Sequence, residues 1–439
     1  MRISSSASLL VACVVLSGAS PSAGDWPSFR GPRASGVAER ARPPVEWDAA
    51  ARRNVRWRAA IPGLSHASPI VWGDRVYAIT AVADEAASDL DMKAEGVVFA
   101  KDTVRHTRRI LAFDRGSGRV IWDRVAHQAT PGQPRHVRGT YANATPATDG
   151  RVIVAVLGNE GLFAFDMEGR AKWRAPLAPS NASWNLDPAS SPVLFDDLAI
   201  VQSDYMKQGF LAAFDAHTGA ERWRVPRAEG LAWSTPTVWT PPGGPPQLVV
   251  NSARWIRSYD PATGREIWRI DNAAQGSWDR VATPIAAGDL MIVTGSGNER
   301  PIIAVRASAR GEQALTPGGA IAWIVERGAP YLATPLVYQG LLYVCAGNGV
   351  LSVYRVETGA LVYRSRVSET PATFSASPVA ANGWIYFASD EGDVVVLRAS
   401  ERFERVAINR MNEPCFATPA ISGDALFIRT ARQLFAIGS

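Results

Sequence analysis

The chain has 439 residues, a formal net charge of +5, and 15 tryptophans, 37 glycines and 30 prolines. Its positive charge is spread along the chain without a Lys/Arg-rich run or an aromatic platform, so the composition excludes a nucleic-acid-binding protein. Weak attraction to anionic surfaces is the most that the charge implies. The length would suit two average domains, but single repeat domains also reach it, so length alone predicts no domain boundary.

The first residues have the pattern of an export signal. Arg2 supplies a positive charge, residues 9–16 form an apolar core, and small residues within 17–23 supply cleavage sites. The apolar core is far too short to span a bilayer, and no other segment qualifies as a membrane span. We therefore predict that residues 1–23 are a signal peptide and that the mature protein is periplasmic or secreted. The Leu-Val-Ala-Cys sequence that ends at Cys13 resembles the lipobox of bacterial lipoproteins, so an acyl anchor on Cys13 is an alternative.

A short phrase, Ser or Thr followed by Pro and an apolar run, occurs eight times. Its spacing is roughly 45 residues over most of the chain, which indicates a repeat architecture rather than separate domains. Because proline has no N–H to donate, it is tolerated at the start of a strand or on a sheet edge. The phrase therefore predicts the start of the inner strand in each repeat. The prolines are Pro69, Pro146, Pro192, Pro236, Pro284, Pro335, Pro378 and Pro419.

Each repeat also contains a hairpin, which is clearest between Ala213 and Trp223. Apolar residues alternate on both sides of a Thr-Gly pair, and glycine supplies the positive φ that such turns need. In the third repeat we expect strands at residues 192–195, 198–201 and 210–214, and a fourth around Trp223. Four strands at this period are typical of the blades of a β-propeller.

The two ends of the chain carry complementary parts of one repeat. The last repeat stops at residues 434–437 without its Trp strand, whereas a Trp strand at residues 54–58 precedes the first Ser-Pro phrase. Pairing these ends would complete a blade and remove an exposed sheet edge. The sequence therefore predicts an all-β fold, an eight-bladed β-propeller of four-stranded antiparallel blades, closed by an N-terminal strand that completes the last blade. We expect residues 24–439 to form this single domain and the protein to be a monomer.

The hairpins resemble the pyrroloquinoline-quinone-like β-propeller repeat, whose motif Ala-x-Asp-x-x-Thr-Gly-x-x-x-Trp matches residues 213–223. The resemblance covers nearly the whole chain after residue 24. It implies that alanines and tryptophans of neighbouring blades stack on one another. It says less about function, because the superfamily includes quinone-dependent dehydrogenases and also non-enzymatic scaffold lipoproteins of outer-membrane assembly. The tryptophans expected to pack between blades are Trp122, Trp173, Trp223, Trp268 and Trp323.

The segments that enter each inner strand should lie on one face of the ring, together with the connections between second and third strands. Propellers usually bind their ligands on this face, and the entering segments are rich in tryptophan and polar residues. A long insertion, residues 81–108, projects over the same rim, and a loop of this length usually has a function or is disordered. The candidate cofactor- or ligand-binding residues on this rim are Trp184, Asn185, Asp187, Trp233, Trp278, Asp279, Arg280 and Glu369.

Two interpretations of these rim residues compete. In a quinone-dependent enzyme, pyrroloquinoline quinone would stack on the tryptophans, Arg280 would polarise its carbonyl, and Ca²⁺ would take oxygen ligands from Asn185, Asp187, Asp279 and Glu369. In a binding or scaffold module, the tryptophans pack between blades and the charges form a solvated rim. The second interpretation is favoured because the sequence has no adjacent cysteine pair, no Cys-x-x-Cys-His haem motif and nearly minimal blades.

Other catalytic patterns are poorly represented. The chain has no Gly-x-Ser-x-Gly motif, and none of its five histidines is four residues from another. We therefore predict neither catalytic residues nor a metal site. Cys345 and Cys415 could form a disulfide only if their Cα atoms lie within about 7 Å of each other, which the sequence leaves open.

These observations predict an exported propeller that acts as a non-catalytic binding or scaffold module, with a protein partner or a small ligand at the Trp-rich rim. A quinone- and Ca²⁺-dependent oxidoreductase is one alternative. A carbohydrate- or peptide-binding protein is another, because tryptophan stacking suits a sugar as well as a quinone.

Overall fold

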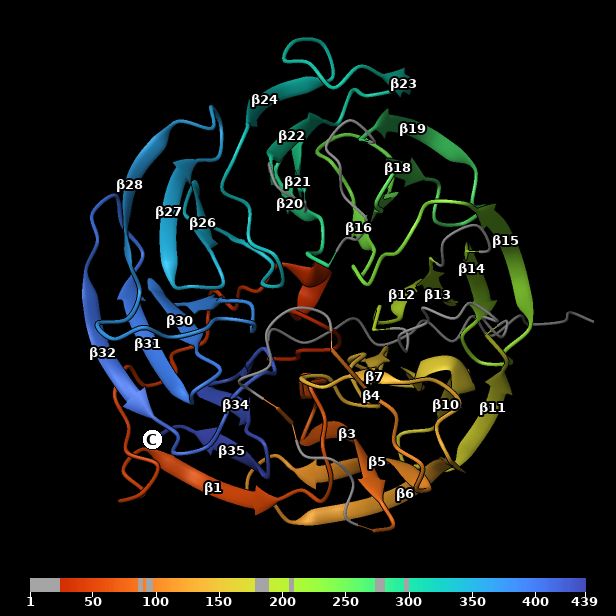
Figure 1. The fold of residues 1–439 in the computed structure, drawn as a ribbon, viewed down its shortest axis with the longest axis vertical. Helices are drawn as coiled ribbons and strands as arrows, with labels where there is room; N and C mark the ends of the chain where they lie inside the picture. Colours follow the sequence, from red (N-terminus) through yellow and green to blue (C-terminus); the bar gives the residue numbers. More distant parts are fainter. Residues whose placement is uncertain are drawn as a thin grey trace, which may run out of the picture.

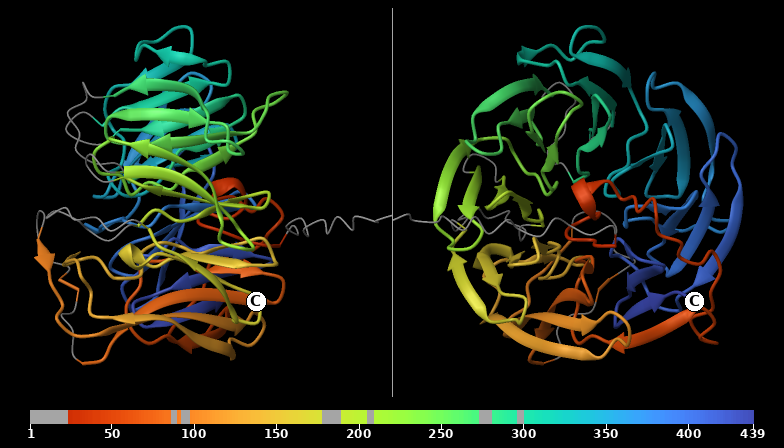
Figure 2. Two further views of the ribbon diagram at one scale, coloured as in Figure 1. Left: turned by 90° about the vertical axis from the view of Figure 1, so that its right-hand side faces the viewer. Right: turned by 180° about the vertical axis from the view of Figure 1, so that it is seen from behind.

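The computed structural model describes residues 24–85, 90–91, 98–177, 189–204, 209–272, 281–295 and 300–439. In these residues the strands form eight sheets arranged as blades around a common centre (Figures 1 and 2). The predicted eight-bladed propeller of four-stranded antiparallel blades is thus confirmed. The described helices are two short 3₁₀ segments, η1 (Pro32–Ala34) and η2 (Gly158–Glu160). Across the same ranges, no helix is long and apolar enough to cross a membrane.

The strands of each blade follow one another from the centre of the ring to its rim (Figure 1). Blade one contains β2 (Ile70–Trp72), β3 (Arg75–Ala83), β5 (His106–Asp114) and β6 (Val120–Ala129). Blade two contains β8 (Ala147–Thr148), β9 (Ile153–Val156), β10 (Leu162–Phe165) and β11 (Ala171–Ala175). Blade three contains β12 (Val193–Phe195), β13 (Leu198–Ser203), β14 (Gly209–Asp215) and β15 (Glu221–Arg227). Blade four contains β16 (Thr237–Trp239), β17 (Gln247–Asn251), β18 (Trp255–Tyr259) and β19 (Glu266–Asp271).

The second half of the ring repeats this order. Blade five contains β20 (Ile285–Ala287), β21 (Leu290–Thr294), β22 (Ile302–Arg306) and β24 (Ile321–Val325). Blade six contains β25 (Leu336–Tyr338), β26 (Leu341–Cys345), β27 (Val350–Arg355) and β28 (Leu361–Arg366). Blade seven contains β29 (Val379–Ala381), β30 (Trp384–Ala388), β31 (Asp393–Arg398) and β32 (Arg405–Arg410). Blade eight contains β33 (Ala420–Ser422), β34 (Ala425–Arg429), β35 (Gln433–Ile437) and the N-terminal strand β1 (Val55–Ala60).

Two short strands lie outside this pattern. β23 (Gly311–Gln313), from the insertion in blade five, pairs in parallel with β19 and adds a fifth strand to the outer edge of blade four. β4 (Phe99–Ala100) and β7 (Arg135–His136) form a separate two-stranded ribbon. The ribbon joins the insertion of blade one to the segment that enters blade two.

The middle strands of the blades are apolar on both faces because each blade is packed between two others. β9 (Ile-Val-Ala-Val) and β14 are buried at every residue, whereas the outer strand β15 alternates between exposed and part-buried positions. Burial on both faces turns the usual alternation of a strand into a continuous apolar run.

The ring is closed by antiparallel pairing between β1 and β35. Val55 is paired with Ile437, Trp57 with Ala436, and Ala59 with Leu434. β35 in turn pairs with β34, so the first and last strands of the chain belong to one sheet. The predicted closure by the N-terminal strand is confirmed, and it leaves neither end of the repeat array with an open edge.

Hydroxyl groups of the Ser/Thr-Pro phrases connect consecutive blades around the centre. In six of the junctions, the backbone N–H of the residue before proline donates to the side-chain hydroxyl of the equivalent residue in the next blade, at 2.9–3.0 Å. These groups are buried, so each bond satisfies a donor that water cannot reach. The donor and acceptor pairs are Ser68–Thr145, Thr145–Ser191, Ser191–Thr235, Thr283–Thr334, Thr334–Ser377 and Ser377–Thr418.

Tryptophans connect the blades a second time, nearer the rim. The indole N–H of Trp173 donates to the carbonyl of Ala216 at 2.9 Å, in the hairpin turn of the next blade. Its ring lies against Gly219 of that turn, where a Cβ atom would be 2.7 Å from the indole. The same arrangement occurs at four other junctions, through Trp57, Trp122, Trp223 and Trp323.

The expected inter-blade tryptophans differ in detail. Trp122, Trp268 and Trp323 are buried, whereas Trp173 and Trp223 are half-buried. Trp268 packs with residues of blade five but donates to Gln247 of its own blade, at 2.9 Å. The difference follows from the insertion of blade five, because β23 pairs beside Trp268 at this junction.

The N-terminal segment before β1 enters the centre of the ring (Figure 1). Trp26 exchanges two backbone hydrogen bonds with Val71 of blade one, at 2.8 and 2.9 Å. The fully buried guanidinium of Arg30 donates to the carbonyls of Thr334, Pro335 and Pro378 at 3.0–3.2 Å. Two further carbonyls, those of Ala34 and Ser35, complete its set of acceptors. Arg30 thus ties the start of the chain to blades six and seven.

Two glycine substitutions would measure what the tryptophan contacts contribute. Gly219 and Gly340 have nearly the same φ, +76° and +75°, but a Cβ at Gly340 would have no heavy atom within 4 Å. Gly340→Ala should lower the free energy of unfolding by only about 1–2 kcal/mol, which is the cost of placing a Cβ atom on a residue in the left-handed conformation. Gly219→Ala should lose roughly 1–3 kcal/mol more, because the methyl group forces Trp173 out of place. Urea unfolding of both variants checks this, and equal losses would show that the contact contributes nothing.

Candidate functional site

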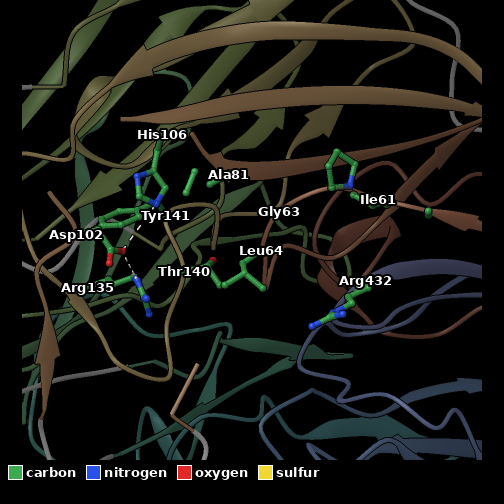
Figure 3. Close-up of a pocket in the computed structure, with 13 residues that line it drawn as sticks. Ile61, Gly63, Leu64, Ala81, Asp102, His106, Arg135, Thr140, Tyr141 and Arg432 are labelled. Atoms are coloured by element: carbon green, nitrogen blue, oxygen red, sulfur yellow. Dashed lines mark hydrogen bonds and ion pairs between the residues drawn. The ribbon is translucent and has the colours of Figure 1, made fainter. Parts of the chain in front are cut away.

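A cleft lies at the junction between blade eight and blade one (Figure 3). Its volume is about 640 Å³, within the range of ligand pockets. Its walls come from the segment that follows β1, the ends of β3 and β5, the segment entering blade two, and the turn between β34 and β35. The cleft is therefore on the face of the entering segments. The lining residues are Ala60, Ile61, Pro62, Gly63, Leu64, Ala81, Ala83, Asp102, His106, Arg135, Thr140, Tyr141 and Arg432.

One wall of the cleft is mostly apolar and open to solvent. Leu64 is held by a pair of backbone hydrogen bonds with Ala81, at 2.9 and 3.1 Å, so the segment after β1 is fixed beside β3. Ile61 donates its N–H to the carbonyl of Arg432 at 2.9 Å, which fixes the same segment to blade eight. The side chain of Arg432 is exposed at the opening (Figure 3). A basic residue beside an apolar wall is suited to a ligand that is amphipathic.

The opposite wall is a buried polar cluster (Figure 3). Nε of Arg135 donates to Oδ2 of Asp102 at 2.9 Å, and its Nη1 donates to the carbonyl of Gly139 at 3.0 Å. Nε2 of His106 is 3.8 Å from the same carboxylate oxygen, and its Nδ1 is 3.0 Å from the carbonyl of Val104. Burial lowers the pKa of His106 from its ordinary value, so the imidazole is neutral near pH 7. These groups satisfy one another and fix the ribbon over the cleft.

The insertion of blade one supplies this wall. β3 and β5 continue to Ala83 and His106, which are themselves paired, so the excursion from the sheet is shorter than residues 81–108. Its described part lies on the face of the entering segments, where β4 pairs with β7. Val98 and Phe99 at the start of β4 are 44% and 37% exposed. The insertion therefore presents apolar side chains to solvent next to the cleft.

An ion pair reaches across the same junction from blade two to blade seven. Nη2 of Arg138, in the segment entering blade two, is 3.1 Å from Oδ2 of Asp390, in the turn between β30 and β31. Asp390 is buried and accepts hydrogen bonds from the backbone N–H and hydroxyl of Ser375, at 2.9 and 2.8 Å. Burial raises the pKa of Asp390 to about 6, in spite of these favourable contacts. The ion pair is therefore complete only above that pH.

Of the rim residues expected from the sequence, Trp233 and Glu369 lie within the described part of the chain. Trp184, Asn185, Asp187, Trp278, Asp279 and Arg280 lie outside the described residues. Trp233 is half-buried in the segment that enters blade four. Glu369 is exposed in the segment that enters blade seven, where it forms an ion pair with Arg405. Neither residue lines the cleft.

Four of the cleft residues, Ala81, Ala83, Asp102 and His106, lie in the insertion that the sequence placed over the rim, whereas the other lining residues were not singled out. Asp102, Arg135 and Tyr141 carry no motif, and the ribbon that joins them depends on pairing between segments that are 36 residues apart. The one available signal was the density of charged and histidine residues between positions 102 and 138.

The described residues do not fit a quinone–calcium centre. The one candidate calcium ligand among them, Glu369, forms an ion pair with Arg405. The buried carboxylate of Asp390 accepts a hydrogen bond from Ser375 and forms an ion pair with Arg138. Within the described ranges, no group of three His, Cys, Asp or Glu side chains could hold a metal ion. Cys345 and Cys415 are both free and buried, so they form no disulfide, and burial raises the pKa of both thiols.

The fold and its repeats define a β-propeller of the pyrroloquinoline-quinone-like class. A family model described as "outer membrane protein assembly factor BamB" matches residues 36–232, 106–316 and 252–437. The three matches overlap and together span nearly the whole described ring. The chain therefore belongs to the BamB family. No curated protein matches the chain by sequence.

Solved structures with the same fold come from both branches of the class. BamB from Moraxella catarrhalis is 13% identical, with a TM-score of 0.55 over 81% of this chain and 98% of that one. Quinohemoprotein alcohol dehydrogenase from Comamonas testosteroni is 12% identical, with a TM-score of 0.62 over 95% and 81%. Quinohemoprotein alcohol dehydrogenase ADHIIG from Pseudomonas putida HK5 is 12% identical, with a TM-score of 0.60 over 95% and 80%. At these identities the likeness shows the fold alone.

The raised pKa of Asp390 predicts a particular dependence of stability on pH. In the unfolded chain this carboxyl titrates near 3.8, so between about pH 4 and pH 6 the folded state holds a proton that the unfolded state has lost. The free energy of unfolding therefore keeps the full contribution of the protonated Asp390 below pH 3.8, and it loses this contribution as the pH rises through about 6. Asp390→Asn should therefore reduce the decline in the free energy of unfolding over this pH range by roughly 2 kcal/mol.

Urea unfolding at a series of pH values between 4 and 7 checks this prediction. Asp289→Asn, which changes an exposed carboxylate in blade five, is the matched control and should keep the wild-type profile. A wild-type profile in the Asp390→Asn variant would show that Asp390 titrates as an ordinary surface carboxyl.

Proposed function

We propose that this protein is an exported, non-catalytic binding module that takes part in outer-membrane protein assembly. On this proposal it holds a segment of a protein partner in the cleft between blades eight and one. Membership of the BamB family supports the assembly role, since that family is described by it. The observation that carries the binding role is the cleft of about 640 Å³, with its apolar wall at Ile61, Leu64 and Ala81.

The chemistry of the cleft favours binding over catalysis. Its carboxylate, Asp102, is paired with Arg135, and its imidazole, His106, is neutral and close to both Asp102 and the carbonyl of Val104. A general acid or base needs a side chain within reach of a substrate proton. These side chains instead fix the ribbon that carries Val98 and Phe99. Apolar residues exposed beside a preformed cleft are typical of a protein-binding surface.

A protein segment suits this cleft better than a sugar or a quinone. Trp233, the described residue among the tryptophans expected to stack a ring system, does not line the cleft. An apolar side chain of the partner would occupy the wall at Leu64, and an acidic group would lie near the exposed Arg432. The partner is therefore expected to present apolar and acidic residues together.

Two leucine substitutions test this proposal. Leu64→Glu places a charge on the apolar wall of the cleft and should lower partner binding at least tenfold, since burying an unpaired carboxylate is strongly unfavourable. Leu361→Glu makes the same change at a residue that is 54% exposed on β28, away from the cleft, and should leave binding unchanged. Both variants should fold, which circular dichroism and thermal unfolding would check.

Binding is read in cells of the natural host with a photo-crosslinking amino acid at Ala83 in the cleft, or at Gly243 on the hairpin between β16 and β17. A cross-link to an envelope protein from position 83, lost with Leu64→Glu and retained with Leu361→Glu, supports the proposal. Cross-links from position 243 alone would place the partner elsewhere. Dye-linked alcohol oxidation by protein incubated with pyrroloquinoline quinone and Ca²⁺ would overturn the non-catalytic assignment.

A further inference from the structure

Arg429, the last residue of β34, is a buried cation whose donors are poorly satisfied. The residue is 1% exposed. Its Nη1 and Nη2 atoms are each 3.5 Å from an acceptor, the carbonyl of Ile79 and the hydroxyl of Thr80, and its buried Nε has no hydrogen-bond partner. Bonds of this length are at the outer limit of hydrogen bonding. Burial lowers the pKa of Arg429 to about 10, which still leaves it charged at neutral pH.

The other buried arginines show what a satisfied guanidinium looks like in this fold. Arg30 donates to five carbonyls at 3.0–3.2 Å. Arg227 forms a buried ion pair with Asp204 at 2.7 Å, and Arg135 forms one with Asp102 at 2.9 Å. Arg429 has neither arrangement. Its two hydrogen bonds are both 3.5 Å long, and no carboxylate of the described residues forms an ion pair with it. A buried charge without compensation is costly, so a further group is expected at this position.

A small cavity lies where that group would be needed. It has a volume of about 10 Å³ and is lined by Arg429, Thr430, His66 and Phe416, among others. This is about the space that one water-sized species occupies. Nε2 of His66 is buried and also lacks a hydrogen-bond partner, and the His66 ring lies against Phe416, with centroids 4.7 Å apart. Two residues with an unsatisfied nitrogen atom, one from blade eight and one from the segment entering blade one, therefore line the same cavity.

The charged groups that shift the pKa of His66 are all positive, and the hydroxyl of Thr430, which also lines the cavity, donates to Oε2 of Glu413. Burial and the charges of Arg429, Arg135 and Arg138 together lower the pKa of His66 to about 3, so the imidazole is neutral. A neutral imidazole can donate one hydrogen bond from Nε2. A water molecule could accept from these donors, but it would leave the charge of Arg429 uncompensated. An anion of similar size would satisfy the donors and the charge together.

We propose that this cavity binds a single monoatomic anion, chloride under physiological conditions, between Arg429 and His66. The anion would accept from Nε of Arg429 and from Nε2 of His66. Since Arg429 belongs to blade eight and contacts β3 of blade one, the anion stabilises the junction at which the ring closes. This site is separate from the cleft, and it does not depend on the identity of any partner.

Bromide provides a direct test on the intact protein. Crystals grown with sodium bromide in place of sodium chloride should give an anomalous difference peak within hydrogen-bonding distance of Nε of Arg429. A peak there, replaced by chloride density in chloride-grown crystals, supports the proposal. An ordered water without anomalous signal at that position, or a cavity without density, would overturn it.

Thermal unfolding provides the matching measurement in solution. At constant ionic strength, replacing gluconate with chloride at ten times its dissociation constant should raise the Tm of the wild type by about 1–2 °C. Arg429→Met, which keeps an unbranched side chain but removes the guanidinium and its charge, should lose this chloride dependence. Arg432→Met changes an exposed arginine three residues away and should retain it. An equal chloride effect in both variants would show that chloride acts elsewhere on the protein.

Discussion

The pairing of β1 with β35 is the constraint on which the rest of the structure depends. A propeller blade cannot bury both faces of its sheet unless it has a neighbour on each side, so an open array would leave two apolar faces in water. The chain covers both faces by closing the ring. Its strand β1 forms the outer strand of the last blade, where Trp57 is paired with Ala436. Trp57 then docks on Gly118 of blade one, as the other tryptophans dock on their neighbours. Closure is thus one more repeat of the same contact.

The closing junction is also where the unusual chemistry is concentrated. The cleft, the ion pair between Arg138 and Asp390, and the unsatisfied Arg429 all lie at or across blades eight and one. The reason is topological. At this junction the segment following β1 must cross from the outer strand of blade eight to the inner strand of blade one, and the insertion of blade one folds above it.

The repeat could be predicted from the sequence because each of its motifs consists of residues that are close together in the chain. The Ser/Thr-Pro phrases, the Thr-Gly hairpins and the complementary chain ends specified the strands, the blade number and the closure. The function of the Ser/Thr hydroxyls was not predicted, because each one accepts from a residue about one repeat away. The position of Arg30 was missed for the same reason, since its acceptors are more than 300 residues distant.

The candidate site was harder to predict than the fold. Sequence analysis favoured tryptophans and acidic residues of the entering segments, as expected for a ligand that stacks. The described cleft instead depends on Leu64, Asp102, His106 and Arg135, which become neighbours only through the ribbon of β4 and β7. Periodicity identifies residues that repeat, and these residues do not repeat. A site built from one insertion in one blade leaves no periodic trace.

Hydrogen–deuterium exchange of the full-length protein tests the central claim most directly. If β1 closes the ring, its hydrogen-bonded amides should exchange as slowly as those of β35, because both strands open only when blade eight separates. The amides of β34 and β35 should show the same protection as the equivalent strands of blade seven. Exchange of β1 at the rate of an unstructured peptide, with β35 still protected, would contradict the account, because it would mean that the ring is stable without its N-terminal strand.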